Sequence, residues 1–271
     1  MKGFFAVLLL AVCFSSCAPN NVTVDNSLGN YFKDAHAAGC FALLDNSSGE
    51  FIIYNLKRYR DSAFVPASTF DLPNALIGLQ TGIINNDSMA IKWDGVQRAT
   101  PEWNQDLSMY HAFRVSAIPY FQEVARRIGR DTMQRWLDSL AYGTKKIKTT
   151  IDSFWLDGSL KVTPDEELGF VKRLYFSQLP FFKVNQEIVK RAMIWEQNSD
   201  YTLAYKSGWS ISNSAQAKPV GWMLGWVVKD QQPRFFLLNL ESADPKFDRD
   251  AQTMRILKSI LQQLQLLPAK A

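Results

Sequence analysis

The amino-acid sequence predicts an α+β fold, an antiparallel sheet flanked by helices with a mostly helical subdomain. Two β-type runs lie near the N-terminus, and a long central block carries apolar residues at helical spacing. Three further β-type runs then precede a last amphipathic segment. This grouping of strands and helices suggests an antiparallel sheet covered by helices. The chain has 271 residues, of which 47% are hydrophobic, so it can bury a sizeable core.

The first half of the chain is predicted to form a hairpin and then helices. Residues 40–45 (CFALLD) and 51–55 (FIIYN) are strand-like and flank the turn sequence NSSG. From Pro66 onward apolar residues recur at helical spacing, and the same pattern continues over residues 116–128 and 131–140. Another helix is predicted after Thr163, which precedes Pro-Asp-Glu-Glu and is suited to cap a helix start rich in acidic residues.

Strand character returns near the C-terminus. Residues 201–209, 220–228 and 234–240 are β-type runs separated by polar turns, a pattern typical of an antiparallel meander. Residues 250–266 then show the spacing of an amphipathic helix that closes the domain.

The N-terminus is typical of an export signal. Lys2 precedes an apolar run over residues 4–14, which is too short to span a bilayer, and small residues lead to Cys17. This pattern resembles a bacterial lipobox and predicts a signal peptide over residues 1–16, a lipid anchor at Cys17 and a periplasm-facing location in the cell envelope. Ordinary cleavage near Ala18 is the alternative. We expect a tether over residues 17–38 and one folded domain over residues 39–268.

Composition excludes several classes of function. Lys and Arg number 30 against 26 Asp and Glu, and this small, scattered surplus does not indicate nucleic-acid binding. His36 and His111 are the only histidines, so no metal site or other cofactor is predicted. Once the signal is removed, Cys40 is the single cysteine of the domain. We therefore expect a buried core residue there and no intramolecular disulfide.

Three short motifs carry the candidate chemistry. Ser68-Thr69-Phe70 lies at a predicted helix start, where backbone N–H groups favour developing negative charge. Ser116-Ala117-Ile118 opens another predicted helix, and Lys206-Ser207-Gly208 lies on a predicted strand that could face a bound carboxylate. Taken singly, each motif also fits a helix cap or a solvated strand edge. Their order and wide spacing make chance less plausible.

With these motifs the chain resembles the class D (oxacillinase-type) serine β-lactamases, of the penicillin-binding serine acyltransferase superfamily. The resemblance runs from about residue 39 to the last helix and implies a transpeptidase-like fold. Further segments that carry it are residues 54–58 (YNLKR), 73–79 (PNALIGL), 103–106 (WNQD), 155–160 (WLDGSL), 178–181 (QLPF) and 221–227 (GWMLGWV).

The resemblance implies a role for each matching residue. Ser68 would be the acylated nucleophile, and Ser116 would relay a proton to the leaving nitrogen. Ile118 would fill the hydrophobic position of the same motif. Trp155 matches the tryptophan that hydrogen-bonds the catalytic base.

On the late strands the resemblance implies the substrate-binding side of the site. Lys206, Ser207 and Gly208 would line the side that holds the substrate carboxylate, and Arg249 would bind that carboxylate. The backbone N–H groups of Ser68 and Trp209 would form the oxyanion hole. The ligand would be a β-lactam or a similar small molecule derived from peptidoglycan.

Position 71 departs from the family pattern. The family has a carboxylated lysine three residues after the nucleophile, whereas this chain has Asp71. Residues three apart share a helix face, so Asp71 should lie beside Ser68. Its carboxylate falls short of the family's by about 6 Å. We therefore expect acylation to persist and deacylation to be slow, since a general base must approach to about 2.6–3.2 Å. A β-lactam hydrolase with impaired turnover is the first interpretation, and a non-hydrolytic penicillin-binding sensor or decoy is the alternative.

Overall fold

A seven-stranded sheet forms the centre of the molecule. The computed structural model describes residues 21–210, 219–244 and 247–268. The strand order is β1-β3-β2-β9-β8-β7-β6, and neighbours are antiparallel except for the parallel pair β1 and β3. The strands of this sheet are β1 (Val22–Val24), β2 (Ala38–Asp45), β3 (Phe51–Tyr54), β6 (Ile194–Gln197), β7 (Tyr201–Trp209), β8 (Val220–Lys229) and β9 (Gln232–Glu241).

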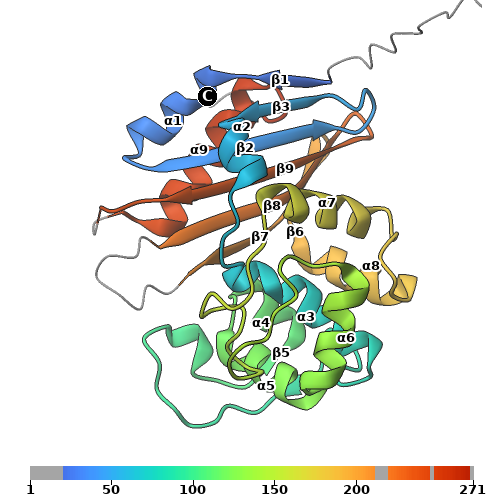
Figure 1. The fold of residues 1–271 in the computed structure, drawn as a ribbon. Helices are drawn as coiled ribbons and strands as arrows, with labels where there is room; N and C mark the ends of the chain where they lie inside the picture. The colour runs from blue at the N-terminus through green and yellow to red at the C-terminus, as the bar shows by residue number, and fades with distance from the viewer. Residues whose placement is uncertain (1–20, 211–218, 245–246, 269–271) are drawn as a thin grey trace, which may run out of the picture.

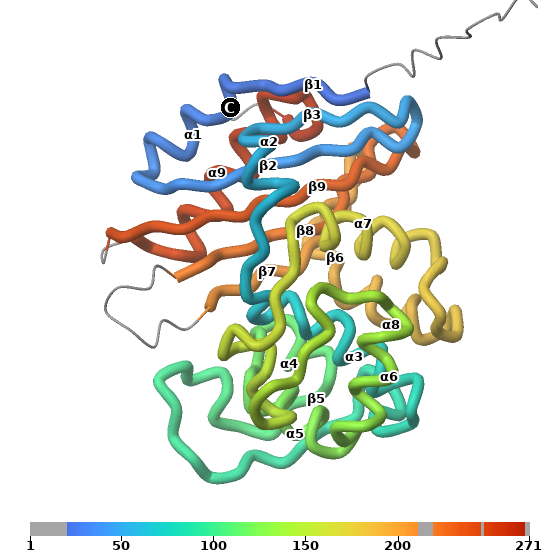
Figure 2. The backbone as a smooth tube through the Cα atoms, viewed as in Figure 1, coloured from blue at the N-terminus to red at the C-terminus, as the bar shows by residue number. Residues whose placement is uncertain are grey.

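Helices cover both faces of this sheet, and a helical subdomain lies beyond β7, at the opposite end of the sheet from β1 (Figure 1 and Figure 2). A short ribbon of β4 (Ala90–Ile91) and β5 (Leu107–Ser108) lies in that subdomain. The helices are α1 (Gly29–Asp34), α2 (Leu56–Asp61), α3 (Asp71–Gln80), α4 (Met109–Arg114), α5 (Ile118–Ile128), α6 (Arg130–Leu140), α7 (Pro164–Tyr175), α8 (Lys183–Met193) and α9 (Arg249–Gln263). No helix of the described ranges is long and apolar enough to cross a bilayer.

Alternating side chains of the strands divide the core into two clusters. On β2, Phe41 packs with α1 and α9 on one face, whereas Cys40 and Ala42 pack on the face that meets the helical subdomain. Cys40 is free and buried, as expected for a small core residue. The predicted α+β class and the meander of β7, β8 and β9 are therefore confirmed.

The predicted tether is wrong over residues 22–38. β1 pairs with β3, with Val22 opposite Phe51, and α1 packs against the sheet through Phe32. Leu28 and Phe32 are buried, so this segment belongs to the domain. Its few apolar residues are separated by polar ones, and β1 is stabilised by a distant strand, so local periodicity carried little signal. Residues 1–16 and Cys17 lie outside the described residues.

Two predicted helix starts differ in detail, and both concern candidate site residues. A 3₁₀ turn over Ala67–Phe70 precedes α3, so Ser68 lies in a tighter turn than an α-helix provides. Ser116 lies in the loop before α5, which begins at Ile118. By contrast, the predicted cap at Thr163 is confirmed, because Thr163 forms a reciprocal capping box with Glu166.

Candidate active site

The turn that bears Ser68 is held in a strained backbone conformation. Ala67 has φ 51°, in the left-handed region that a β-carbon disfavours by about 1–2 kcal/mol. Its N–H donates to the carbonyl of Trp155 at 3.1 Å. Ser116 has a similar φ of 49°. Such strain persists where the surrounding structure fixes it, and it is concentrated at functional sites.

Strand β7 packs directly onto this turn at Gly208. A β-carbon at this position would lie 2.8 Å from the backbone N of Thr69 and 2.9 Å from that of Ser68, closer than real β-carbons come. A glycine is therefore required, and the strand backbone approaches the Ser68 amide closely.

The N–H of Trp209, next along β7, points away from β8. Ser210 donates to the carbonyl of Val220, its register partner on the neighbouring strand. Because backbone groups alternate along an antiparallel strand, the Trp209 N–H faces the opposite side. On that side β6 pairs with β7 only from Ala204 back toward its start. The Trp209 amide is thus directed toward the unpaired edge of β7.

Lys206, Asp71 and Ser116 form one polar chain, whose Ser116 end reaches the cleft described below. Lys206 Nζ lies 3.1 Å from Asp71 Oδ2, 2.6 Å from Ser116 Oγ and 2.8 Å from the carbonyl of Ser207. The contact with Asp71 is an ion pair without the alignment of a hydrogen bond. Lys206 and Asp71 are only 3% and 2% exposed. Lys206 therefore lies buried between Asp71 and Ser116, and its expected role beside the substrate carboxylate stays a prediction.

Burial shifts the pKa of both partners in this pair. Asp71 begins α3, which is buried from Asp71 to Leu79, and this desolvation raises the pKa of the Asp71 carboxyl to about 6 against the opposing effect of Lys206. Desolvation likewise lowers the pKa of Lys206, while Asp71 opposes the shift. Both groups can therefore exchange protons nearer neutral pH than their exposed counterparts.

The Lys206→Met variant is expected to lose about 3–5 kcal/mol of unfolding free energy at pH 8, because the buried Asp71 carboxylate loses its partner and must either stay charged alone or take up a proton. The loss should shrink at pH 5, where Asp71 is neutral. Urea denaturation at both values measures it, and the double variant Lys206→Met/Asp71→Asn should recover most of the loss. A loss of equal size at both pH values would contradict the assigned charge state.

A cleft of about 550 Å³ brings most of the predicted residues together. Ser68, Ser116, Ile118, Ser207, Gly208, Trp209 and Arg249 line it. Ser68 is 5% exposed. Arg249 opens α9, and its guanidinium lies 5.5 Å from the centre of the Trp209 ring. One cleft thus holds the hydroxyls of three serines, the unpaired edge of β7 and the Arg249 cation.

Trp155 lies behind this cleft. Its ring stacks on Phe70, with centroids 5.4 Å apart. No hydrogen bond among the described residues joins Trp155 to Asp71, so the expected bond between them is absent from this structure. The short aspartate side chain remains near the start of α3, where Lys206 pairs with it.

The cleft also contains residues that the sequence did not indicate. Arg114 and Trp195 line it, and the Arg114 guanidinium lies 3.4 Å from the centre of the Trp195 indole. Trp195 in turn stacks on Tyr205, with 5.0 Å between centroids. Trp195 is on β6, a four-residue strand too short for a clear periodicity signal.

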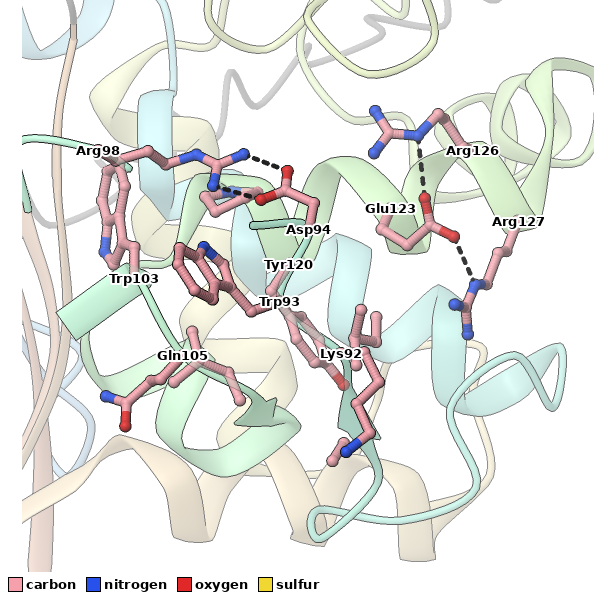
Figure 3. Close-up of a pocket in the computed structure, with 14 residues that line it drawn as sticks. Lys92, Trp93, Asp94, Arg98, Trp103, Gln105, Tyr120, Glu123, Arg126 and Arg127 are labelled. Atoms are coloured by element: carbon pink, nitrogen blue, oxygen red, sulfur yellow. Dashed lines mark hydrogen bonds and ion pairs between the residues drawn. The ribbon is translucent and has the colours of Figure 1, made fainter. Parts of the chain in front are cut away.

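A second hollow, of about 300 Å³, lies in the helical subdomain and includes none of the predicted catalytic or substrate-binding residues (Figure 3). Its charged groups are all in ion pairs: Arg98 with Asp94, Arg126 and Arg127 with Glu123, and Lys92 with Asp106, which lies outside the hollow. The chemistry therefore concentrates in the cleft that contains Ser68.

The sequence of this chain is similar to those of known proteins over most of its length. The family model of the penicillin binding protein transpeptidase domain matches residues 39–262. β-Lactamase OXA-10 of Pseudomonas aeruginosa is 36% identical over 241 residues, which cover 89% of this chain and 90% of the relative. β-Lactamase OXA-48 of Klebsiella pneumoniae is 34% identical over 264 residues, 97% of each chain.

Solved structures share the fold across nearly the whole domain. The class D β-lactamase YbXI from Nostoc superposes with a TM-score of 0.84 at 34% identity and covers 90% of this chain and 100% of that one. The C-terminal domain of the Bacillus licheniformis BlaR penicillin receptor gives a TM-score of 0.84 at 32% identity, covering 91% and 98%.

Proposed function

The chain belongs to the class D β-lactamases, within the family that shares the penicillin-binding transpeptidase domain, and we propose that it opens β-lactams by acylation of Ser68. The observation that supports this most is the close approach of β7 to the Ser68 turn at Gly208. It leaves the amides of Ser68 and Trp209 beside one cleft, where they could stabilise an oxyanion.

In the acylation step, Ser68 Oγ attacks the lactam carbonyl carbon and the carbonyl–nitrogen bond breaks. The Asp71 carboxylate takes the Ser68 proton, and the Ser116 hydroxyl gives its proton to the departing nitrogen. Lys206 replaces the Ser116 proton across their 2.6 Å contact and is reprotonated from Asp71 across the ion pair. Arg249 binds the substrate carboxylate, and no proton is gained or lost overall.

Deacylation is the impaired step in this proposal. A hydrolytic water needs a base within about 2.6–3.2 Å, positioned against the acyl carbonyl. The Asp71 carboxylate is buried, lies against Lys206, and is not among the groups that line the cleft. We therefore expect a long-lived acyl-enzyme and weak hydrolysis of penicillins.

A chromogenic cephalosporin and a fluorescent penicillin test this function together. Stoichiometric labelling with slow release of product would support it. Failure to label at any concentration would contradict it.

Asp71 also favours a second candidate, a receptor or decoy that is acylated once and remains acylated. The BlaR domain that superposes on this chain is described as a penicillin receptor. This alternative predicts labelling with no measurable turnover over hours, whereas the first predicts slow recovery of unlabelled protein.

We also propose that Cys17 carries a lipid that anchors the domain to an envelope membrane, on the periplasmic side. The full-length protein made in a bacterial host should partition into the detergent phase, and Cys17→Ala should shift it to the aqueous phase. Cys13→Ala, four residues earlier in the apolar run, is the matched control and should behave as wild type. Equal partitioning of the Cys17→Ala and wild-type proteins would contradict lipidation.

A further inference from the structure

A buried acid, Glu167, lies directly behind the turn that bears Ser68. It is in the first turn of α7 and is 0% exposed. Its Oε1 atom lies 2.7 Å from the hydroxyl of Thr69, the neighbour of Ser68, and 2.7 Å from the hydroxyl of Tyr142. Its Oε2 atom is buried with no hydrogen-bond partner among the described residues. The mechanism above makes no use of this group.

Counting protons at these contacts favours a protonated Glu167. Thr69 Oγ1 also lies 2.8 Å from the carbonyl of Pro66, so three short oxygen–oxygen contacts need three protons. The Thr69 and Tyr142 hydroxyls supply two. If Glu167 is protonated, it donates to Thr69, Thr69 donates to Pro66 and Tyr142 donates to Glu167. If Glu167 is ionised, only two protons are present for the three contacts. In one of the contacts two oxygen atoms then face each other with no hydrogen between them.

The surroundings favour the neutral acid. Within the described residues no Lys, Arg or His lies within ion-pair distance of Glu167. The charged group that acts on it from its own helix is Glu166, a like charge. On the α2 side, the Tyr59 hydroxyl is engaged with Asp165. Burial raises the pKa of Glu167 to about 7, although the Thr69 and Tyr142 hydroxyls oppose the shift.

We propose that Glu167 is a positioning residue which, as a neutral carboxylic acid, holds the Ser68 turn in its reactive form and loses one of these hydrogen bonds when it ionises. After ionisation the Thr69 hydroxyl has one proton for two acceptors. It either donates to Glu167 and loses its hydrogen bond to the Pro66 carbonyl, or it keeps that bond and its oxygen faces the Glu167 oxygen with no hydrogen between them. It also places a negative charge behind the turn where Ser68 must develop one. This inference rests on the proposed role of Ser68 as the nucleophile.

The pH dependence of the acylation rate tests the proposal. The wild-type rate should rise as Asp71 ionises and then fall about tenfold between pH 6.5 and 8.5 as Glu167 ionises. Glu167→Gln, neutral at every pH, should keep the rising limb and lose the falling one. Glu166→Gln, the same change at the adjacent exposed position, is the matched control: it should keep both limbs, with the falling limb moved to lower pH because a like charge beside Glu167 is removed. A falling limb of wild-type size in Glu167→Gln would overturn the proposal.

Two further measurements keep the test valid if Glu167→Gln folds poorly. Tyr142→Phe removes a hydrogen bond that favours the carboxylate, so its falling limb should move to higher pH, and an unmoved limb would count against the proposal. Infrared spectra of the Asp71→Asn protein, which lacks the Asp71 carboxyl, should show a protonated-carboxyl carbonyl band at pH 6 that is lost at pH 9 and is missing when Glu167→Gln is added. Its absence at pH 6 would overturn the proposal, and this reading does not depend on whether Ser68 acylates.

Discussion

The Asp71→Lys variant, assayed with benzylpenicillin in bicarbonate buffer, is expected to turn over substrate about 10²–10⁴ times faster than the wild type. A lysine at this buried position would have a lowered pKa, and its neutral amine could take up carbon dioxide. The resulting carbamate is again an anion beside Lys206, which now pairs with Asp71 at 3.1 Å. It would extend about 6 Å further and could orient the hydrolytic water.

The expected gain should depend on bicarbonate. Asp71→Asn is the matched control, because it keeps the size of the side chain but removes the base, and its turnover should stay at or below the wild-type value. A bicarbonate-independent gain would contradict the mechanism. So would an Asp71→Lys protein that folds and acylates normally but releases product no faster than the wild type.

Ser68→Ala is expected to abolish covalent labelling by penicillin, with a loss of at least about 10⁴-fold in acylation rate, since it removes the hydroxyl that forms the proposed ester. The free energy of unfolding should change little, because the Ser68 hydroxyl lines the cleft. Hydrogen bonds of Thr69 and of the Trp155 carbonyl hold the turn instead. Labelling is read by intact mass or gel fluorescence.

The control for this variant is Ser199→Ala, an exposed serine of the loop between β6 and β7 that does not line the cleft. It should label at the wild-type rate. A covalent adduct of penicillin mass on the Ser68→Ala protein would show that another nucleophile carries the chemistry.

The parts of the fold that the sequence predicted well are those with strong local periodicity. Strand β7 was predicted over residues 201–209 and spans the same residues, because a long buried strand constrains every side chain. The segment before residue 39 was misjudged, since β1 exists only through its pairing with β3. Local sequence contains little information about such distant partners.

The candidate site shows the same difference between features that local sequence predicts and features that depend on distant parts of the fold. Motif resemblance indicated Ser68, Ser116 and Gly208, and the fold brings them to one cleft. The orientation of Lys206 could not be predicted, because it depends on the register of β7 and on the distance to Asp71. Glu167 resembled any helix-start acid in the sequence, and only its burial against Thr69 distinguishes it.

An intact-mass time course after a single addition of benzylpenicillin is the most direct test of whether Ser68 is acylated and then released slowly. We expect the adduct to form within minutes, to map to Ser68 and to persist while free drug remains. Rapid consumption of the drug with unmodified protein at every time point would show that Asp71 supports deacylation, and would contradict a long-lived acyl-enzyme.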